Sequence, residues 1–141
     1  MKLSRYLSGI ISLIVLAATL FLQMLPYGVV LIFSSGPNEI IKQKFSYFSL
    51  TPFGYANIFP LLTAILTVVV TILSAIAILK RMNVTKLQNT AFICTVIALI
   101  FSIFPILMFG TGYLSMVGIF ITILLLASLI FQALSSRKEN Y

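Results

Sequence analysis

Residues 87–136 decide the fold, and they read LQNTAFICTVIALIFSIFPILMFGTGYLSMVGIFITILLLASLIFQALSS. These 50 residues contain no Asp, Glu, Lys or Arg. A single α-helix of this length would be about 75 Å long, whereas the hydrocarbon core of a bilayer is about 30 Å thick. The chain must therefore fold back, and Gly-Thr-Gly at 110–112 is the turn signal nearest the middle. We predict two spanning helices here, at 88–109 and 113–135.

Two further charge-free stretches, 6–38 and 45–79, come earlier in the chain, and each has room for one span of about 20 residues. We predict an all-α integral membrane protein: one membrane domain over 1–141, an antiparallel four-helix bundle with a short structured outer loop between the first two helices. The other predicted segments are spans at 6–33 and 57–79, an outer loop at 34–56, an inner loop at 80–87, an outer turn at 110–112 and a tail at 136–141.

Composition and charge place the chain in lipid and orient it. Hydrophobic residues make up 61% of the chain and charged residues 8%, far below the roughly one quarter of a soluble domain. Lysine and arginine favour cytoplasmic loops, so both termini are predicted to be cytoplasmic. The Phe- and Ile-rich composition and the absence of Trp predict a bacterial plasma membrane. The basic residues are scattered among short segments, so we predict contact with the lipid bilayer and none with nucleic acid. The predicted inner side carries Lys2, Arg5, Lys80, Arg81, Lys86, Arg137 and Lys138, and the outer side Lys42 and Lys44.

The outer segment 38–50 fits two secondary structures. Ile41, Phe45 and Phe48 follow an i, i+4, i+7 spacing with polar residues between them, which predicts a short amphipathic helix lying on the outer surface, with Pro37 at its first position. The aromatic residues of 44–50 also suit a strand, and this alternative stays open. Pro60 is expected in the first turn of the second spanning helix, where its missing N–H does no harm.

Small and hydroxyl residues recur along each predicted helix at spacings of three, four and seven, so each set lies on one helix face. Such faces allow close packing in lipid, or they line a polar path. Gln23 is the strongest polar side chain in the apolar zone and must find a partner there. The predicted packing or lining residues are Gln23, Thr63, Thr67, Thr71, Thr95 and Ser102.

Catalytic machinery is missing from the sequence. The predicted spans contain no ionisable acid or base, and the chain has no His. Proton-coupled pumps need a titratable group in the membrane, and most hydrolases need a nucleophile beside a base. The single cysteine, Cys94, is read as a packing residue. We therefore predict a protein that is not an enzyme, with no catalytic residue, no cofactor and no metal.

The outer segment is the predicted recognition surface, because aromatic side chains dominate binding hot spots. We expect an accessory or immunity-like protective membrane protein that binds a membrane-protein partner or forms a homo-oligomer. Rings that only anchor the loop in the headgroups are one alternative. Others are a small oligomeric channel or transporter and a non-catalytic subunit of a membrane enzyme complex. The predicted partner-binding residues are Phe45, Tyr47, Phe48, Phe53, Tyr55 and Phe59.

Overall fold

The protein is mostly helical and carries one small sheet in the computed structural model. The structure describes residues 2–37, 39–51, 55–80, 85–113 and 115–136, without the side chains of 2–5, 35, 55–56, 80 and 85. In chain order the elements are α1 (Lys2–Met24), β1 (Val29–Gly36), β2 (Glu39–Phe45), α2 (Tyr55–Lys80), α3 (Thr85–Phe109), the 3-10 turn η1 (Thr111–Tyr113) and α4 (Met116–Ser136).

Within the described residues, four helices are long and apolar enough to cross a membrane, with mean hydropathy between 2.2 and 2.7 over their spanning parts. The prediction of four such helices is confirmed, and the chain is a multi-pass membrane protein by length and composition of these helices. Their outward faces carry large apolar side chains, such as Ile14, Ile72, Ile100 and Ile123, each more than half exposed. Exposure on this scale suits lipid as the surrounding solvent. The spanning parts are Tyr6–Met24, Asn57–Leu79, Lys86–Phe109 and Met116–Ser136.

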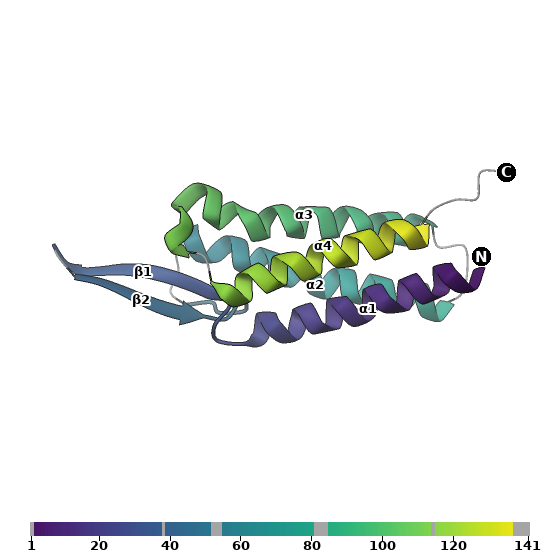
Figure 1. The fold of residues 1–141 in the computed structure, drawn as a ribbon, viewed down its shortest axis with the longest axis horizontal. Coiled ribbons are helices and arrows are strands. Elements are labelled where there is room, and N and C mark those ends of the chain that lie inside the picture. Colours follow the sequence, from purple (N-terminus) through teal and green to yellow (C-terminus); the bar gives the residue numbers. More distant parts are fainter. Residues whose placement is uncertain (1, 38, 52–54, 81–84, 114, 137–141) are drawn as a thin grey trace.

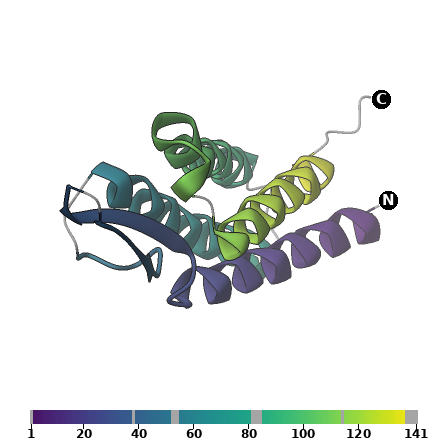
Figure 2. The ribbon, with the colours of Figure 1, turned by 60° about the vertical axis from the view of Figure 1, so that its left-hand side comes forward.

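The helices pack lengthwise, and α2 lies mainly against α3 while α1 lies mainly against α4. Figure 1 shows the start of α1 and the end of α4 at one end of the molecule, and the β1–β2 hairpin projecting from the other end. Figure 2 shows from a second side that the hairpin continues past the end of α1. The molecule therefore has a helical body with one extension.

The first helix ends at Met24, so the predicted span over 6–33 is wrong in its last third. A continuous helix over 6–33 would be about 42 Å long, well above the bilayer core. Pro26 lacks a backbone donor, and the β-branched run that follows Gly28 favours a strand. Those residues form β1, Val29–Gly36.

The predicted amphipathic helix over 38–50 is also wrong, because residues Glu39–Phe45 form the strand β2. It pairs with β1 in an antiparallel hairpin, with Val29 opposite Phe45 and Phe33 opposite Ile41. Pro37 lies in the hairpin turn and not at a helix start. The apolar strand β1 supplies the pairing partner that the i, i+4, i+7 pattern could not reveal. The fold is therefore helical with a two-stranded sheet and not all-α.

The structure also places the helix ends. Pro60 lies inside α2, whose first residue is Tyr55, and so not in the first turn as expected.

The turn between α3 and α4 lies where it was predicted. Gly110 adopts a positive φ of 85°, and its N–H donates to the Ile106 carbonyl at 2.9 Å. A glycine in this conformation is a common helix ending because it has no Cβ to clash.

The interior of the helical body is unusually polar. Among the described side chains, eleven buried ones are polar and thirteen are apolar, Pro60 and Pro105 included. Helices in lipid gain no hydrophobic energy by associating, so contact between small and hydroxyl residues carries more of the packing. The buried polar residues are Ser12, Thr19, Gln23, Asn57, Thr63, Thr67, Thr95, Ser102, Ser115, Ser128 and Gln132.

Candidate functional site

Tyr47 anchors the base of the hairpin in the helical body. Its backbone N–H donates to the carbonyl of Gln23 at 3.0 Å, and its side chain is only 4% exposed. The ring lies against the backbone of Gly28, where a Cβ would be 2.7 Å from Cδ2 of Tyr47. Burial raises the pKa of Tyr47, and a hydrogen bond with Ser102 partly offsets the rise. Tyr47 is therefore a packing residue of the core, with its hydroxyl held inside.

Serine, threonine and glycine tie the same region to α3 and α4. The Ser115 hydroxyl donates to the carbonyl of Gly28 and accepts a hydrogen bond from the N–H of Gly118 at 2.8 Å. The hydroxyls of Ser102 and Thr122 lie 2.6 Å apart and share one hydrogen bond. The first contact joins the segment after α1 to the start of α4, and the second joins α3 to α4. The base of the hairpin is thus hydrogen-bonded to the helical body.

The described members of the predicted aromatic surface differ in their burial and in their contacts. Phe45 is half-buried and makes an edge contact with Phe33 of β1, with ring centroids 6.4 Å apart. Phe59 is half-buried against α3, with its ring centroid 4.5 Å from that of Phe104. Phe48 is 36% exposed. Phe53 and the side chain of Tyr55 lie outside the described residues.

The predicted packing or lining residues do lie inside the helical body. Gln23 is fully buried, and its Nε2 donates to the Thr67 hydroxyl at 3.1 Å. The Thr67 hydroxyl donates in turn to the Thr63 carbonyl at 2.7 Å. Thr71 is half-buried and donates to the carbonyl of Thr67 at 2.7 Å. Because each threonine can bond the preceding turn of its own helix, the stripe is satisfied without water.

Thr95 and Ser102 complete this predicted set on α3. The Thr95 hydroxyl lies 2.8 Å from the Ala91 carbonyl and 3.1 Å from Oε1 of Gln132, and both contacts are buried. Ser102 faces Thr122 of α4. The two residues therefore connect α3 with α4 at two different depths.

Sequence reasoning missed the second half of the polar face of α4. Ser128 and Gln132 are buried, and they were not among the predicted residues. Steps of three and four residues from Thr122 reach Ser128 and then Gln132, so extending the pattern would have found both. The Ser12 hydroxyl donates to the Ser128 carbonyl at 3.3 Å, so this half of the face joins α4 to α1.

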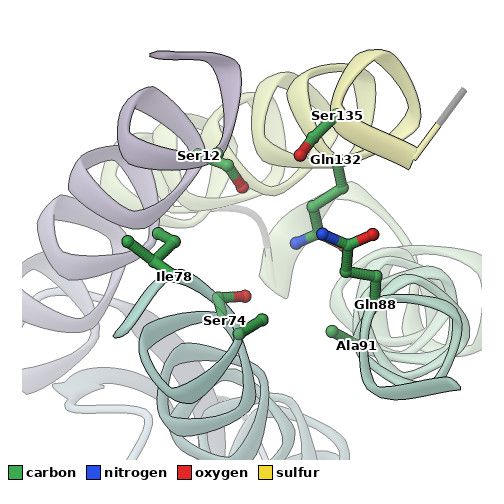
Figure 3. Close-up of a pocket in the computed structure, with 9 residues that line it drawn as sticks. Ser12, Ser74, Ile78, Gln88, Ala91, Gln132 and Ser135 are labelled. Carbon is green, nitrogen blue, oxygen red and sulfur yellow. The ribbon is translucent and has the colours of Figure 1, made fainter. Parts of the chain in front are cut away.

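A pocket lies between all four helices near the end where α1 starts and α4 ends (Figure 3). We call it the terminal pocket. It encloses about 390 Å³ of space, part of it open to the surroundings. Among the described residues its lining carries serine hydroxyls and two glutamine amides but no charged side chain. Its lining residues are Gly9, Ser12, Ser74, Ala77, Ile78, Gln88, Ala91, Gln132 and Ser135.

The hairpin provides a second candidate surface. Every residue of β2 from Glu39 to Lys44 is exposed, including Ile40 at 71% and Ile41 at 43%. β1 lies between β2 and the body, in contact with α2 and η1. Lys44 lies over the ring of Tyr27, with its Nζ 5.8 Å from the ring centroid. The outer side of β2 thus combines apolar and basic side chains on a projecting strand.

No protein-family model, no curated protein and no solved structure matches this chain, so its function has to be inferred from its own geometry.

Proposed function

We propose that this chain is a non-enzymatic interaction protein of a bacterial plasma membrane, whose hairpin binds a partner membrane protein outside the bilayer. In this proposal the four helices form an antiparallel bundle that spans the bilayer, with both termini in the cytoplasm. The distribution of basic residues supports the orientation, because seven of nine then lie on the cytoplasmic side. The accessory and immunity-like roles considered from the sequence both need such a surface.

The exposure of β2 carries the proposal. A hairpin of two strands is only marginally stable alone, and this one is supported at its base while the rest projects into solvent (Figure 1). An edge strand presents unpaired backbone N–H and C=O groups along its length. Ile40 and Ile41 are isoleucines left in solvent on such a strand. A partner strand that covers them would bury their apolar area and form hydrogen bonds with the backbone groups of the edge strand.

The favoured occupant is an extended segment of the partner's outer domain, added as a third strand beside β2. β1 already contacts α2 and η1 on the other side, so β2 is the edge left for pairing. Ile40 and Lys42 are two residues apart and point to the same face of the sheet. An incoming strand with acidic and apolar side chains on that face would complement them. This proposal assigns recognition to the exposed strand β2 and no longer to the predicted set of aromatic residues.

An oligomeric channel or transporter is the second candidate, and the polar interior of the body supports it. However, Leu16, Val70 and Ala91 form one buried apolar cluster across this interior. Ala64, Ile121 and Leu125 belong to another. A conduction path would then have to run between copies of the chain. A role as a non-catalytic subunit of a membrane enzyme complex would use the same hairpin surface and is a special case of the first proposal.

Site-specific photo-crosslinking tests the proposal. A photo-reactive residue at Gln43, which is exposed on β2, is expected to give one discrete heteromeric adduct in intact membranes. The double change Ile40→Ser with Ile41→Ser should abolish that adduct while the amount of folded protein stays the same, because both side chains are exposed. Leu50→Ser, at 64% exposure outside the strands, is the matched control. An adduct that persists in the double variant contradicts the proposal, and an adduct with a second copy favours the oligomer.

A further inference from the structure

Gln132 presents an unpartnered amide atom to the terminal pocket. The residue is only 9% exposed, and its Nε2 has no hydrogen-bond partner among the described residues. Its other amide atom, Oε1, lies 3.1 Å from the Thr95 hydroxyl. Figure 3 shows the amide of Gln132 reaching into the pocket, which Gln88 also lines. A buried polar atom without a partner destabilises the fold, so a partner at this point would be stabilising.

The chemistry of the missing partner follows from the contacts of Thr95. The Thr95 hydroxyl also lies 2.8 Å from the Ala91 carbonyl and can donate its proton there. When the Thr95 proton goes instead to Gln132 Oε1, the Nε2 donor faces the pocket. When the proton goes to Ala91, the amide can turn by 180° so that Nε2 donates to Thr95 and Oε1 faces the pocket. In one orientation the pocket-facing atom is a donor, and in the other it is an acceptor. A hydroxyl group satisfies both, because it donates and accepts.

The other described lining residues favour a neutral polyol over a charged ligand. Ser12, Ser74 and Ser135 add hydroxyls from three helices, and no charged side chain is among the described lining residues to neutralise an ion. Ile78 supplies an apolar wall. An ion would therefore lose its hydration with no opposite charge in return. Several neutral hydroxyl and carbonyl groups on one small ligand would match this mixture.

The depth of the pocket points to a lipid. Ser74 lies six residues before the end of α2, which is about 9 Å along the axis at 1.5 Å per residue. Gln132 lies four residues before the end of α4, or about 6 Å. The headgroup layer on each side of the bilayer core is about 5–8 Å thick. The pocket thus lies near the boundary between headgroups and acyl chains, where the glycerol ester of a lipid is found.

We propose that the terminal pocket binds an uncharged glycerol group through Gln132, and that the group belongs to a neutral glycerolipid whose acyl chain lies among the apolar helix faces. Free glycerol has the same chemistry and is the alternative source. This site is independent of the hairpin and of the partner proposed for it.

The test uses the full chain in detergent micelles with radiolabelled monoolein, an uncharged lipid with two hydroxyls and one ester. Monoolein should bind saturably. Methyl oleate, which has the chain and the ester but no hydroxyl, should not compete with it. Gln132→Leu should weaken binding about tenfold, the value of one hydrogen bond of ordinary strength. Thr95 keeps its contact with Ala91 in this variant, so the fold should survive. Ser74→Leu fills the pocket from α2, leaves Gln132 and Thr95 themselves unchanged, and should abolish binding.

Gln23→Leu is the matched control, because it also removes a buried amide with one unpartnered atom, but outside the pocket. It should bind monoolein as the unmodified protein does. If millimolar glycerol instead displaces monoolein from the unmodified protein but not from Gln132→Leu or Ser74→Leu, that result would support the site, with a soluble polyol as its ligand. Equal competition by methyl oleate, no saturable binding, or unchanged binding in the folded Ser74→Leu protein would each overturn the proposal.

Discussion

Replacing Gly28 by alanine should destabilise the protein through the ring of Tyr47. The new Cβ would lie 2.7 Å from Cδ2 and 3.0 Å from Cε2 of that ring. Ordinary contact begins at 3.4 Å, so one of the two groups must move by 3.4 − 2.7 = 0.7 Å. The ring has little room to move, because it is buried and its backbone N–H is bonded to Gln23. Overpacking of this kind typically costs about 1–3 kcal/mol.

Reversible unfolding in mixed micelles, followed by circular dichroism, would measure this cost as a change in the free energy of unfolding. Gly36→Ala is the matched control, since nothing lies within 4 Å of the Cβ that it would add. The double variant Gly28→Ala with Tyr47→Leu should show a smaller cost than the two single changes added together, because the leucine leaves space for the new methyl group. A Gly28→Ala protein as stable as Gly36→Ala would refute the reasoning that the hairpin base is closely packed.

Three further predictions concern other parts of the molecule. In a Cys94→Ala background, a membrane-impermeant thiol reagent added to intact cells should label a cysteine at Ser35 but not one at Ser136, and labelling at Ser136 would contradict cytoplasmic termini. Thr67→Val should lower the free energy of unfolding more than Gln23→Leu does, because the valine leaves the buried Gln23 amide without its partner. Gln23→Leu leaves the Thr67 hydroxyl bonded to Thr63. An equal loss in the two variants would contradict this reasoning. Because burial raises the pKa of Tyr47, the neutral phenol stabilises the fold below the ordinary value of 10.0, and this contribution is lost as the pH rises through the raised value. Stability measured from neutral to strongly alkaline pH should therefore fall less steeply in Tyr47→Phe, and identical alkaline slopes would count against the burial of Tyr47.

Much of the membrane part could be predicted from local composition alone. The absence of charge over 45–79 and 87–136 requires lipid around those segments, since one short chain cannot cover so much apolar surface by itself. The glycine at 110 could be identified as a turn because positive φ suits glycine best. The four-residue spacing of Thr63, Thr67 and Thr71 placed them on one face, and they are buried or half-buried in the structure. These features depend on neighbours in sequence, and such neighbours are visible without a structure.

The hairpin and the pocket were decided by tertiary structure. An apolar run such as Val29–Phe33 suits a spanning helix or a strand, and composition does not distinguish them. Pairing with β2 and packing against α2 and η1 selected the strand. Tyr47 turned inward because Gly28, nineteen residues earlier, left space for its ring. Gln132 and Ser74 became neighbours only when α4 and α2 came together around one pocket. Periodicity assigns a residue to a face of its own helix, whereas the group that meets that face depends on contacts between segments far apart in the chain.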